Sequence, residues 1–407
     1  MFSKSASVKF IFVTILLDAI GLGIVIPTLP DVVRRFVSDP TEVSQYFGYF
    51  ISLYALMQFF ASPVLGALSD RFGRRSILLI SLFGAGVDFL LMAYAPNLWI
   101  LFLGRLISGI TGASMTVASS YMADISTDQN RAANFGMIGA AWGMGFIAGP
   151  LLGGLLGAMG PGAPFVAAAV MSFLNFLFGL FVLPESLPKK QRRHVTLSRL
   201  NPFISLYKVL KPSPVSVLVW AFFLMFMSGQ VHPSIWTLYT EYRFQWSAFA
   251  VGLSLTFVGL TIAIVQGGLT RVIIPKLGES KVLVWGLWFN ILGFACFGLA
   301  TQGWMMYVVM AFSALGGLVP PAAQSLIARR TPPQEQGELQ GSLMSMGSLT
   351  AILAPLLYTN LFAQFTNGNG PVELPGAPYL AAALISLIAW LMIKLKHQVD
   401  DTPVIDA

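Results

Sequence analysis

Long apolar stretches separated by short polar ones run along all 407 residues of the chain. Within a stretch the apolar residues are continuous, as in 215–227, whereas the strands of a membrane β-barrel would alternate apolar and polar positions. Only helices and closed barrels satisfy every backbone polar group in lipid. The pattern therefore predicts an all-α polytopic membrane protein.

Twelve of these stretches reach the length of about 20 residues that a helix needs to cross a bilayer. The predicted transmembrane helices are 8–29, 44–68, 76–95, 98–122, 131–157, 163–183, 213–240, 247–269, 281–300, 303–327, 336–364 and 376–395. The first is not expected to be a cleaved signal, because Asp18 interrupts its apolar run and no small-residue cleavage site follows.

Positive charge sets the predicted orientation. With both termini in the cytoplasm, 20 of the 24 Lys and Arg residues fall in inside segments, and only Arg34, Arg35 and Arg243 fall outside. This asymmetry is the one that cytoplasmic loops usually show. The net charge of +7 therefore reports topology, and no nucleic-acid partner is expected, because the basic residues are spread over many short loops.

Composition narrows the class further. The chain is 56% apolar and 10% charged, against about 25% charged in soluble domains, which excludes a soluble, disordered or disulfide-rich secreted protein. Cys296 is the only cysteine, and the three histidines lie far apart, so neither a disulfide nor a metal site is expected. We find no P-loop motif and no nucleophile–base set, so we expect no cofactor and no enzyme activity.

The two halves of the chain repeat at an offset of 205 residues. The matching pairs are Gly73 with Gly278, Trp99 with Trp304, Gly112 with Gly317, Gly136 with Gly341, and Pro150 with Pro355. This predicts a six-helix bundle over 1–183, a cytoplasmic linker over 184–212 and a second six-helix bundle over 213–407. Two such bundles would enclose a central cavity and rock against each other to give alternating access.

The linker contains apolar residues at helical spacing, among them Phe203, Leu206 and Leu210. This pattern favours a short amphipathic helix on the inner membrane surface, although a simple tether explains it as well.

The loop between the second and third spans carries the strongest local signal, Gly66-Ala-Leu-Ser-Asp-Arg-Phe-Gly-Arg-Arg75. Gly73 permits a tight turn. Asp70 sits at a helix C-terminus, where a negative charge needs a nearby cation, and Arg71 and Arg74 can supply it. Asp124 lies at the same predicted depth and could extend the pair to a cluster. The alternative is an ordinary basic inside loop, which would also contain Arg75.

Three ionisable residues lie within the spans: Asp18, Asp88 and Arg105. A charge at the bilayer centre costs about 2.5–3.5 kcal/mol on insertion scales, so such residues usually face a cavity or a partner. Asp18 is predicted near the midplane, and a carboxylate in such a cavity can bind and release a proton. Asp88 and Arg105 share a depth about 10 Å below the outer surface and can form a pair. For Asp18 a structural carboxylate, and for the pair a static ion pair, are the alternatives.

Small residues recur in the first and fifth spans, at Gly21 and Gly23 and from Gly145 through Gly149 to Gly154. Such spacing lets helices approach closely, and ordinary membrane packing explains it equally well. Uncharged polar groups in the spans are candidates for substrate binding: Gln58, Gln230, Asn290 and Gln324. His232 is expected at the wet interface near the outer end of its span.

The motif set resembles the major facilitator superfamily. The segment 66–75 looks like its loop 2–3 signature, Gly104-Arg105 with Gly109 looks like its fourth-helix signature, and 145–154 is similar to its antiporter motif. The likeness extends to the tetracycline/proton antiporters and related drug:proton antiporters through Leu-Asp18-Ala, the run 54–58, and Leu-Gln340-Gly.

The resemblance implies gating roles for the residues of the inner loop and its partner: Gly66, Asp70, Arg71, Gly73, Arg74, Arg75 and Asp124. It also implies proton or substrate roles for Asp18, Asp88 and Arg105. Two positions depart from the family pattern. The tetracycline pumps carry an acidic residue where this chain has Asn290, which cannot titrate, and a histidine where it has Ile262.

These residues together predict a secondary transporter that exports a small amphiphilic compound, tetracycline-like or multidrug, in exchange for protons. It is expected in a bacterial inner membrane, as a monomer driven by the proton gradient. An uncoupled facilitator, an exporter of an endogenous metabolite and a membrane sensor are the alternatives.

Overall fold

The computed structural model describes residues 4–112, 114–127, 129–192, 216–329, 336–368 and 372–395. These residues are mainly helical and contain no strand. Eleven of their helical segments are long and apolar enough to cross a membrane, and a twelfth apolar helix, Ala248–Ile264, is shorter. The predicted fold class, all-α with twelve transmembrane helices, is confirmed.

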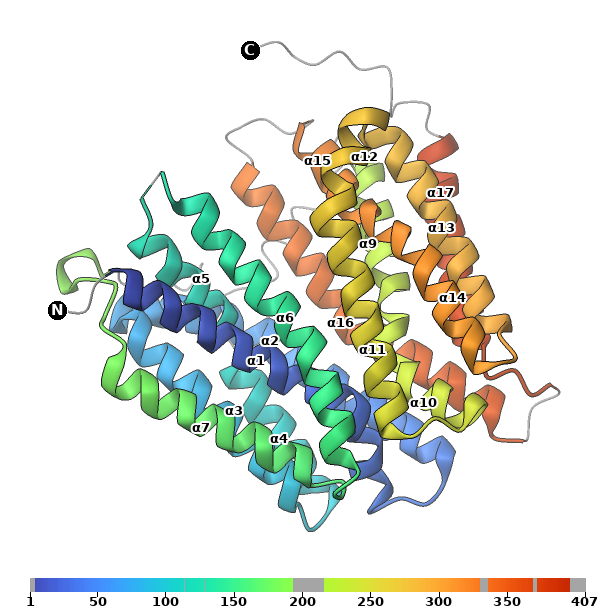
Figure 1. Cartoon of the computed structure of the whole chain (residues 1–407), viewed down its shortest axis with the longest axis horizontal. Coiled ribbons are helices and arrows are strands. Elements are labelled where there is room, and N and C mark those ends of the chain that lie inside the picture. Colours follow the sequence, from blue (N-terminus) through green and yellow to red (C-terminus); the bar gives the residue numbers. More distant parts are fainter. Residues whose placement is uncertain are drawn as a thin grey trace. The chain divides into compact units, whose positions relative to one another are not determined.

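Helices of the first half follow the predicted spans (Figure 1). They are α1 Lys4–Arg34, α2 Pro40–Phe72, α3 Arg74–Tyr94, α4 Leu98–Thr111, α5 Ser114–Ile125, α6 Arg131–Gly157 and α7 Ala163–Val182, with a short 3₁₀ turn, η1, at Lys189–Gln191.

Helices of the second half are more often interrupted. They are α9 Ser216–Gly229, α10 Val231–Phe244, α11 Ala248–Ile264, the π-helical η3 Val265–Leu269, α12 Thr270–Leu277, α13 Glu279–Leu299, α14 Gly303–Ser313, the 3₁₀-helical η4 Ala314–Leu318, α15 Val319–Arg329, α16 Gln336–Thr366 and α17 Ala377–Leu395.

Four predicted spans are therefore broken within the membrane, where the sequence predicted continuous helices. Gly112 ends α4, Gln230 separates α9 from α10 just before Pro233, and the π segment η3 and the 3₁₀ segment η4 interrupt the other two. Gly and Pro are tolerated in transmembrane helices because side chains and local 3₁₀ or π turns satisfy the freed backbone groups. Thr270 shows this, since its hydroxyl donates to the carbonyl of Val265, 3.0 Å away.

Equivalent positions of the repeat adopt equivalent local structure. Gly73 and Gly278 both precede a helix with positive φ, at 105° and 77°. Pro150 and Pro355 both lie inside long helices, α6 and α16. Gly112 and its counterpart Gly317 both lie at a helix break. The 205-residue offset therefore relates three-dimensional features and not only residue identities.

The chain groups into two compact units. The first comprises Met1–Asp39, Phe50–Pro202 and Trp246–Thr256, and the second comprises Pro40–Tyr49, Phe203–Gln245 and Phe257–Ala407. The domain boundaries expected at 183 and 213 stay a prediction, and the predicted linker helix lies outside the described residues from 193 onward.

Close contact between α1 and α6 organises the first unit, where the two helices run side by side (Figure 1). A Cβ placed on Gly149 would lie 2.8 Å from Gly23 Cα, and one on Gly153 would lie 3.0 Å from the carbonyl oxygen of Ile24. No side chain fits at such a crossing, so the two backbones touch directly. Beside it, α1, α2, α3, α5 and α6 bury an apolar core around Ile11 and Tyr121, with Leu183, just after α7, at its edge.

The second unit is built around α9, α13, α15 and α17, which enclose a separate apolar core. Leu287 of α13 and Val319 of α15 are fully buried in it. Gly286 faces Val319 closely, which brings α13 and α15 together near the break at η4.

Candidate functional site: an inner charge cluster and a membrane-depth carboxylate

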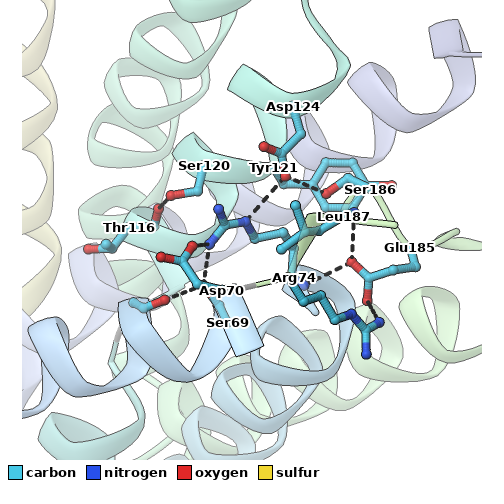
Figure 2. A network of polar contacts seen from close by, with 12 residues as sticks. Ser69, Asp70, Arg74, Thr116, Ser120, Tyr121, Asp124, Glu185, Ser186 and Leu187 are labelled. Atoms are coloured by element: carbon cyan, nitrogen blue, oxygen red, sulfur yellow. Dashed lines mark hydrogen bonds and ion pairs between the residues drawn. The ribbon is translucent and has the colours of Figure 1, made fainter. Parts of the chain in front are cut away.

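Arg74 is the centre of a cluster of charges at the turn between α2 and α3 (Figure 2). Its guanidinium lies 2.5 Å from Asp70 at the end of α2 and 3.2 Å from Asp124 at the end of α5. Nη1 also donates to the Ser69 hydroxyl at 2.6 Å. The Arg74 side chain is 11% exposed, so this charge is paired in a largely desolvated place. The predicted grouping of Asp70, Arg74 and Asp124 is confirmed as geometry.

Gly73 makes the turn that brings these charges together. Its φ of 105° belongs to the region that favours glycine, and its N–H closes α2 on the carbonyl of Ser69 at 3.1 Å. Gly66 has open space around its Cα, and its carbonyl accepts from the Ser69 hydroxyl at 2.7 Å. The turn therefore fixes Ser69 and Arg74 in register with each other.

The other two arginines of the loop lie elsewhere. Arg71 was expected to share in neutralising Asp70, but its guanidinium lies over the ring of Phe72, 5.2 Å from the centroid, at an exposed position. Arg75 points to the end of α7, where Nη2 donates to the carbonyl of Leu180 at 2.6 Å. Arg74 alone of the three pairs with Asp70 in the described contacts, because it begins α3 and faces the end of α2.

A further set of polar contacts extends the cluster to the segment that follows α7, as Figure 2 shows. Glu185 accepts the backbone N–H of Arg74 at 2.8 Å, and the Ser186 hydroxyl donates to Asp124 at 2.9 Å. Tyr121 donates to the carbonyl of Pro184 at 2.7 Å. Sequence reasoning missed these residues. The sequence did offer a signal: Glu185 is an acidic residue just after the predicted span 163–183, in a segment rich in Lys and Arg that is predicted to be cytoplasmic.

The equivalent place in the second half carries the same pair with its charges reversed. Glu279 corresponds to Arg74 and Arg329 to Asp124 at the 205-residue offset, and Arg329 Nη2 lies 2.9 Å from Glu279 Oε1. Helix N-termini favour anions and C-termini favour cations. Glu279 begins α13 and Arg329 ends α15, so both charges suit their helices. In the first half each partner of the pair opposes its helix dipole.

Asp18 lies at the wall of a small cavity within the first unit, lined by both hydroxyl-bearing and apolar residues. The cavity measures about 40 Å³ and is lined by residues of α1 to α5: Asp18, Leu22, Tyr54, Ser81, Ala85, Phe89, Ser108, Thr111, Gly112 and Ser114. Ser114 lies in the same lining as Asp18. Because a water molecule needs at least about 10–15 Å³ and several polar partners, this space can hold water beside the carboxylate. None of the described lining residues is a cation.

Asp88 and Arg105 form a buried ion pair between α3 and α4, as their shared predicted depth allowed. The Asp88 side chain is fully buried and that of Arg105 is 5% exposed. The guanidinium also lies 5.7 Å from the ring centroid of Tyr54, which lines the Asp18 cavity. The charge of Asp88 is thus compensated directly, whereas that of Asp18 is not.

The candidate substrate residues occupy different places. Gln58 donates to the Gly112 carbonyl at 2.8 Å and so supports the cavity wall. Gln230 precedes α10, Asn290 of α13 lies against Gly316, and Gln324 of α15 is exposed. Their roles in binding stay predictions.

His232, expected from the sequence at a wet interface, is half-buried and packs among aromatic rings. Its ring centroid lies 5.1–5.6 Å from those of Trp236, Phe294, Phe297 and Tyr379. Within the described residues, no three His, Cys, Asp or Glu side chains gather as a metal site would require.

Comparison with known proteins identifies the family. The chain matches the family model of the Major Facilitator Superfamily over residues 11–279 and 233–404. Tetracycline resistance protein, class C, from Escherichia coli is 43% identical over 375 residues, which cover 92% of this chain and 94% of the relative. Tetracycline resistance protein, class G, from Vibrio anguillarum is 42% identical over 362 residues, 89% and 92% of the two chains.

The crystal structure of the human organic anion transporter MFSD10 (TETRAN) has the same fold. It superposes with a TM-score of 0.69 at 23% identity and covers 97% of this chain and 100% of that one. The family model spans nearly the whole sequence, and the relatives above share more than two fifths of their aligned residues with it. The chain therefore belongs to the major facilitator superfamily and is a multi-pass membrane transporter related to tetracycline resistance proteins.

Proposed function

We propose that this protein exports a tetracycline-like amphiphilic compound in exchange for protons, across a bacterial inner membrane and with both termini in the cytoplasm. The observation that carries the proposal is the position of Asp18, a carboxylate at membrane depth beside a cavity whose lining combines several hydroxyl groups with apolar side chains. The names of the relatives support the substrate class.

Asp18 has the properties that a proton carrier needs. Its neighbours in the cavity include Tyr54 and Ser114, which are uncharged and can hydrogen-bond to either form of the carboxyl group. Burying a charged carboxylate that has no fixed cation beside it costs free energy, and protonation removes most of that cost. The charged form therefore favours a conformation that exposes it to water, and the neutral form favours one that buries it. That difference in free energy between two conformations is what couples proton movement to alternating access.

Asp88 is less suited to this role because Arg105 holds it in an ion pair. Breaking a buried pair would leave an uncompensated charge at membrane depth. We therefore assign Asp88 and Arg105 to the fixed wall behind the cavity. The inner cluster around Arg74 is assigned to gating, because it joins the ends of three helices through contacts that can open and close.

Asn290 bears on which unit carries the proton. A neutral amide at this position cannot carry a proton, and it packs against Gly316 at the η4 break. Proton coupling is thus assigned to the first unit.

The test is a transport assay with purified protein in proteoliposomes. A pH gradient should drive accumulation of tetracycline, and Asp18→Asn should abolish the dependence on the gradient while leaving exchange of labelled for unlabelled substrate measurable. Asp31→Asn is the matched control, because Asp31 lies on the same helix but pairs with Arg34 near its exposed end, 2.7 Å away. Gradient-driven transport by Asp18→Asn at the wild-type rate would refute the assignment. Wild-type transport that ignores the gradient would indicate an uncoupled facilitator.

A further inference from the structure

We infer that Glu185 is a positioning residue of the inner cluster: it holds the segment 184–192 on the N-terminus of α3 and thereby keeps the Arg74 cluster closed. This inference rests on the proposed gating role of that cluster and adds a residue and a segment to it.

The N-terminus of α3 has no cap of its own. The first N–H groups of a helix lack intrahelical partners, and Gly73, at the cap position, has no side chain to supply one. Glu185 Oε1 takes this place by accepting the Arg74 N–H at 2.8 Å. The same oxygen accepts the N–H of Leu187 at 3.1 Å, so one carboxylate joins α3 to its own segment.

Charge makes this cap more important than an ordinary one. Arg74 places a positive charge at a helix N-terminus, where the dipole opposes it. Glu185 supplies the anion that this helix end lacks, while the Arg74 side chain reaches away toward Asp70 and Asp124. The carboxylate thus lets α3 begin with the arginine that the cluster needs.

The fit around Glu185 is close. A Cβ on Gly73 would lie 2.7 Å from the Glu185 carboxyl carbon, so the glycine is required both for the positive φ and for the approach of this side chain. Arg192 lies 3.8 Å from the other oxygen and holds the far end of the segment. Ser186 and the Pro184 carbonyl add hydrogen bonds to α5, so the segment contacts α3 and α5, two of the three helices whose ends form the cluster.

The test uses Glu185→Gln, which keeps the shape but removes the charge. Glu373→Gln is the matched control, because Glu373 is exposed and also accepts a side-chain hydrogen bond, from Tyr242 at 2.8 Å. Two single-cysteine reporters in a Cys296→Ser background measure opening without any substrate. Leu187→Cys reports on the segment and Met122→Cys on α5, since Leu187 is 8% exposed and Met122 is fully buried.

Glu185→Gln should speed maleimide alkylation at both reporters about tenfold. It should also lower the kcat of proton-driven transport per folded molecule about tenfold, with KM unchanged, because no contact with substrate is removed. Faster alkylation at Leu187→Cys alone would mean that Glu185 holds only its own segment, and it would overturn the inference. Equal effects of Glu373→Gln on both reporters would overturn it as well. If the wild type does not transport tetracycline, the proposed function fails, and the two alkylation rates still decide this inference.

Discussion

Single charged side chains in this protein differ chiefly in how they are compensated. Asp88 has Arg105 beside it, and Arg74 has two carboxylates. The described residues that line the cavity beside Asp18 are hydroxyl-bearing or apolar, and none is a cation. A charge with a fixed partner is held in place, and a charge without one can change its protonation with the state of its surroundings. The division of roles proposed here follows from this difference.

The Asp88–Arg105 pair gives a prediction about stability. Asp88→Asn should destabilise the protein by about 3–5 kcal/mol, because it leaves the Arg105 charge buried without its partner. The double variant Asp88→Asn/Arg105→Gln should recover most of this loss, since no buried charge remains. Melting temperatures in detergent measure both. A double variant less stable than Asp88→Asn would contradict this explanation, because it would show that the unpaired charge of Arg105 is not the cause of the loss.

Sequence reasoning succeeded at this scale for residues on helices that follow each other in the chain. Depth along the spans brought Asp88 to Arg105, and charge at a helix end brought Asp70 to Arg74. Glu185 could not be found in this way, because its partner is a backbone N–H 111 residues earlier in the chain. Only the packing of α7 beside α3 brings the two together.

Helices of this protein approach most closely where glycines leave their surfaces without side chains. At the crossing of α1 and α6 the glycines permit backbone contact, so dispersion between the two backbones replaces side-chain packing. The sequence predicted this close approach from the spacing of small residues in the first and fifth spans. It did not predict where four other spans break, because a Gly or Pro in a membrane helix is compatible with either a continuous or an interrupted path.

Two glycines on α6 test the crossing. Gly149→Leu should force α1 and α6 apart and lower stability by about 1–3 kcal/mol, the usual cost of overpacking. Gly143→Leu is the control on the same helix, because a Cβ there meets nothing within 4 Å. Thermal unfolding of the two purified variants gives the comparison. Equal losses would mean that helix composition, and not the crossing, sets the effect.

At the scale of the whole molecule, the orientation in the membrane follows from the distribution of Lys and Arg. If both termini are cytoplasmic, Ser38 after α1 lies outside and Gln129 between α5 and α6 lies inside; both residues are exposed. In a Cys296→Ser background, a membrane-impermeant maleimide should label Ser38→Cys in intact cells. It should label Gln129→Cys only after the cells are broken. The reverse pattern would overturn the predicted topology.

The twofold repeat was visible in the sequence because glycine, tryptophan and proline keep their register over 205 residues. The reversed charges of the inner pairs were not recognised there, because the comparison of the two halves looked for identical residues. Arg74 and Glu279, and likewise Asp124 and Arg329, share a position but differ in identity. Only the contacts of Arg74 with Asp124 and of Glu279 with Arg329 reveal it.

This reversal has a consequence for the history of the two repeats. If they arose by duplication of an ancestral segment, the charged pair of one repeat can no longer replace that of the other. Arg74→Glu would bring a fourth carboxylate beside Asp70, Asp124 and Glu185, and restoring balance would require changing several neighbours at once. A reversal of this single charge in the first half would therefore place like charges together at short range, which is electrostatically unfavourable.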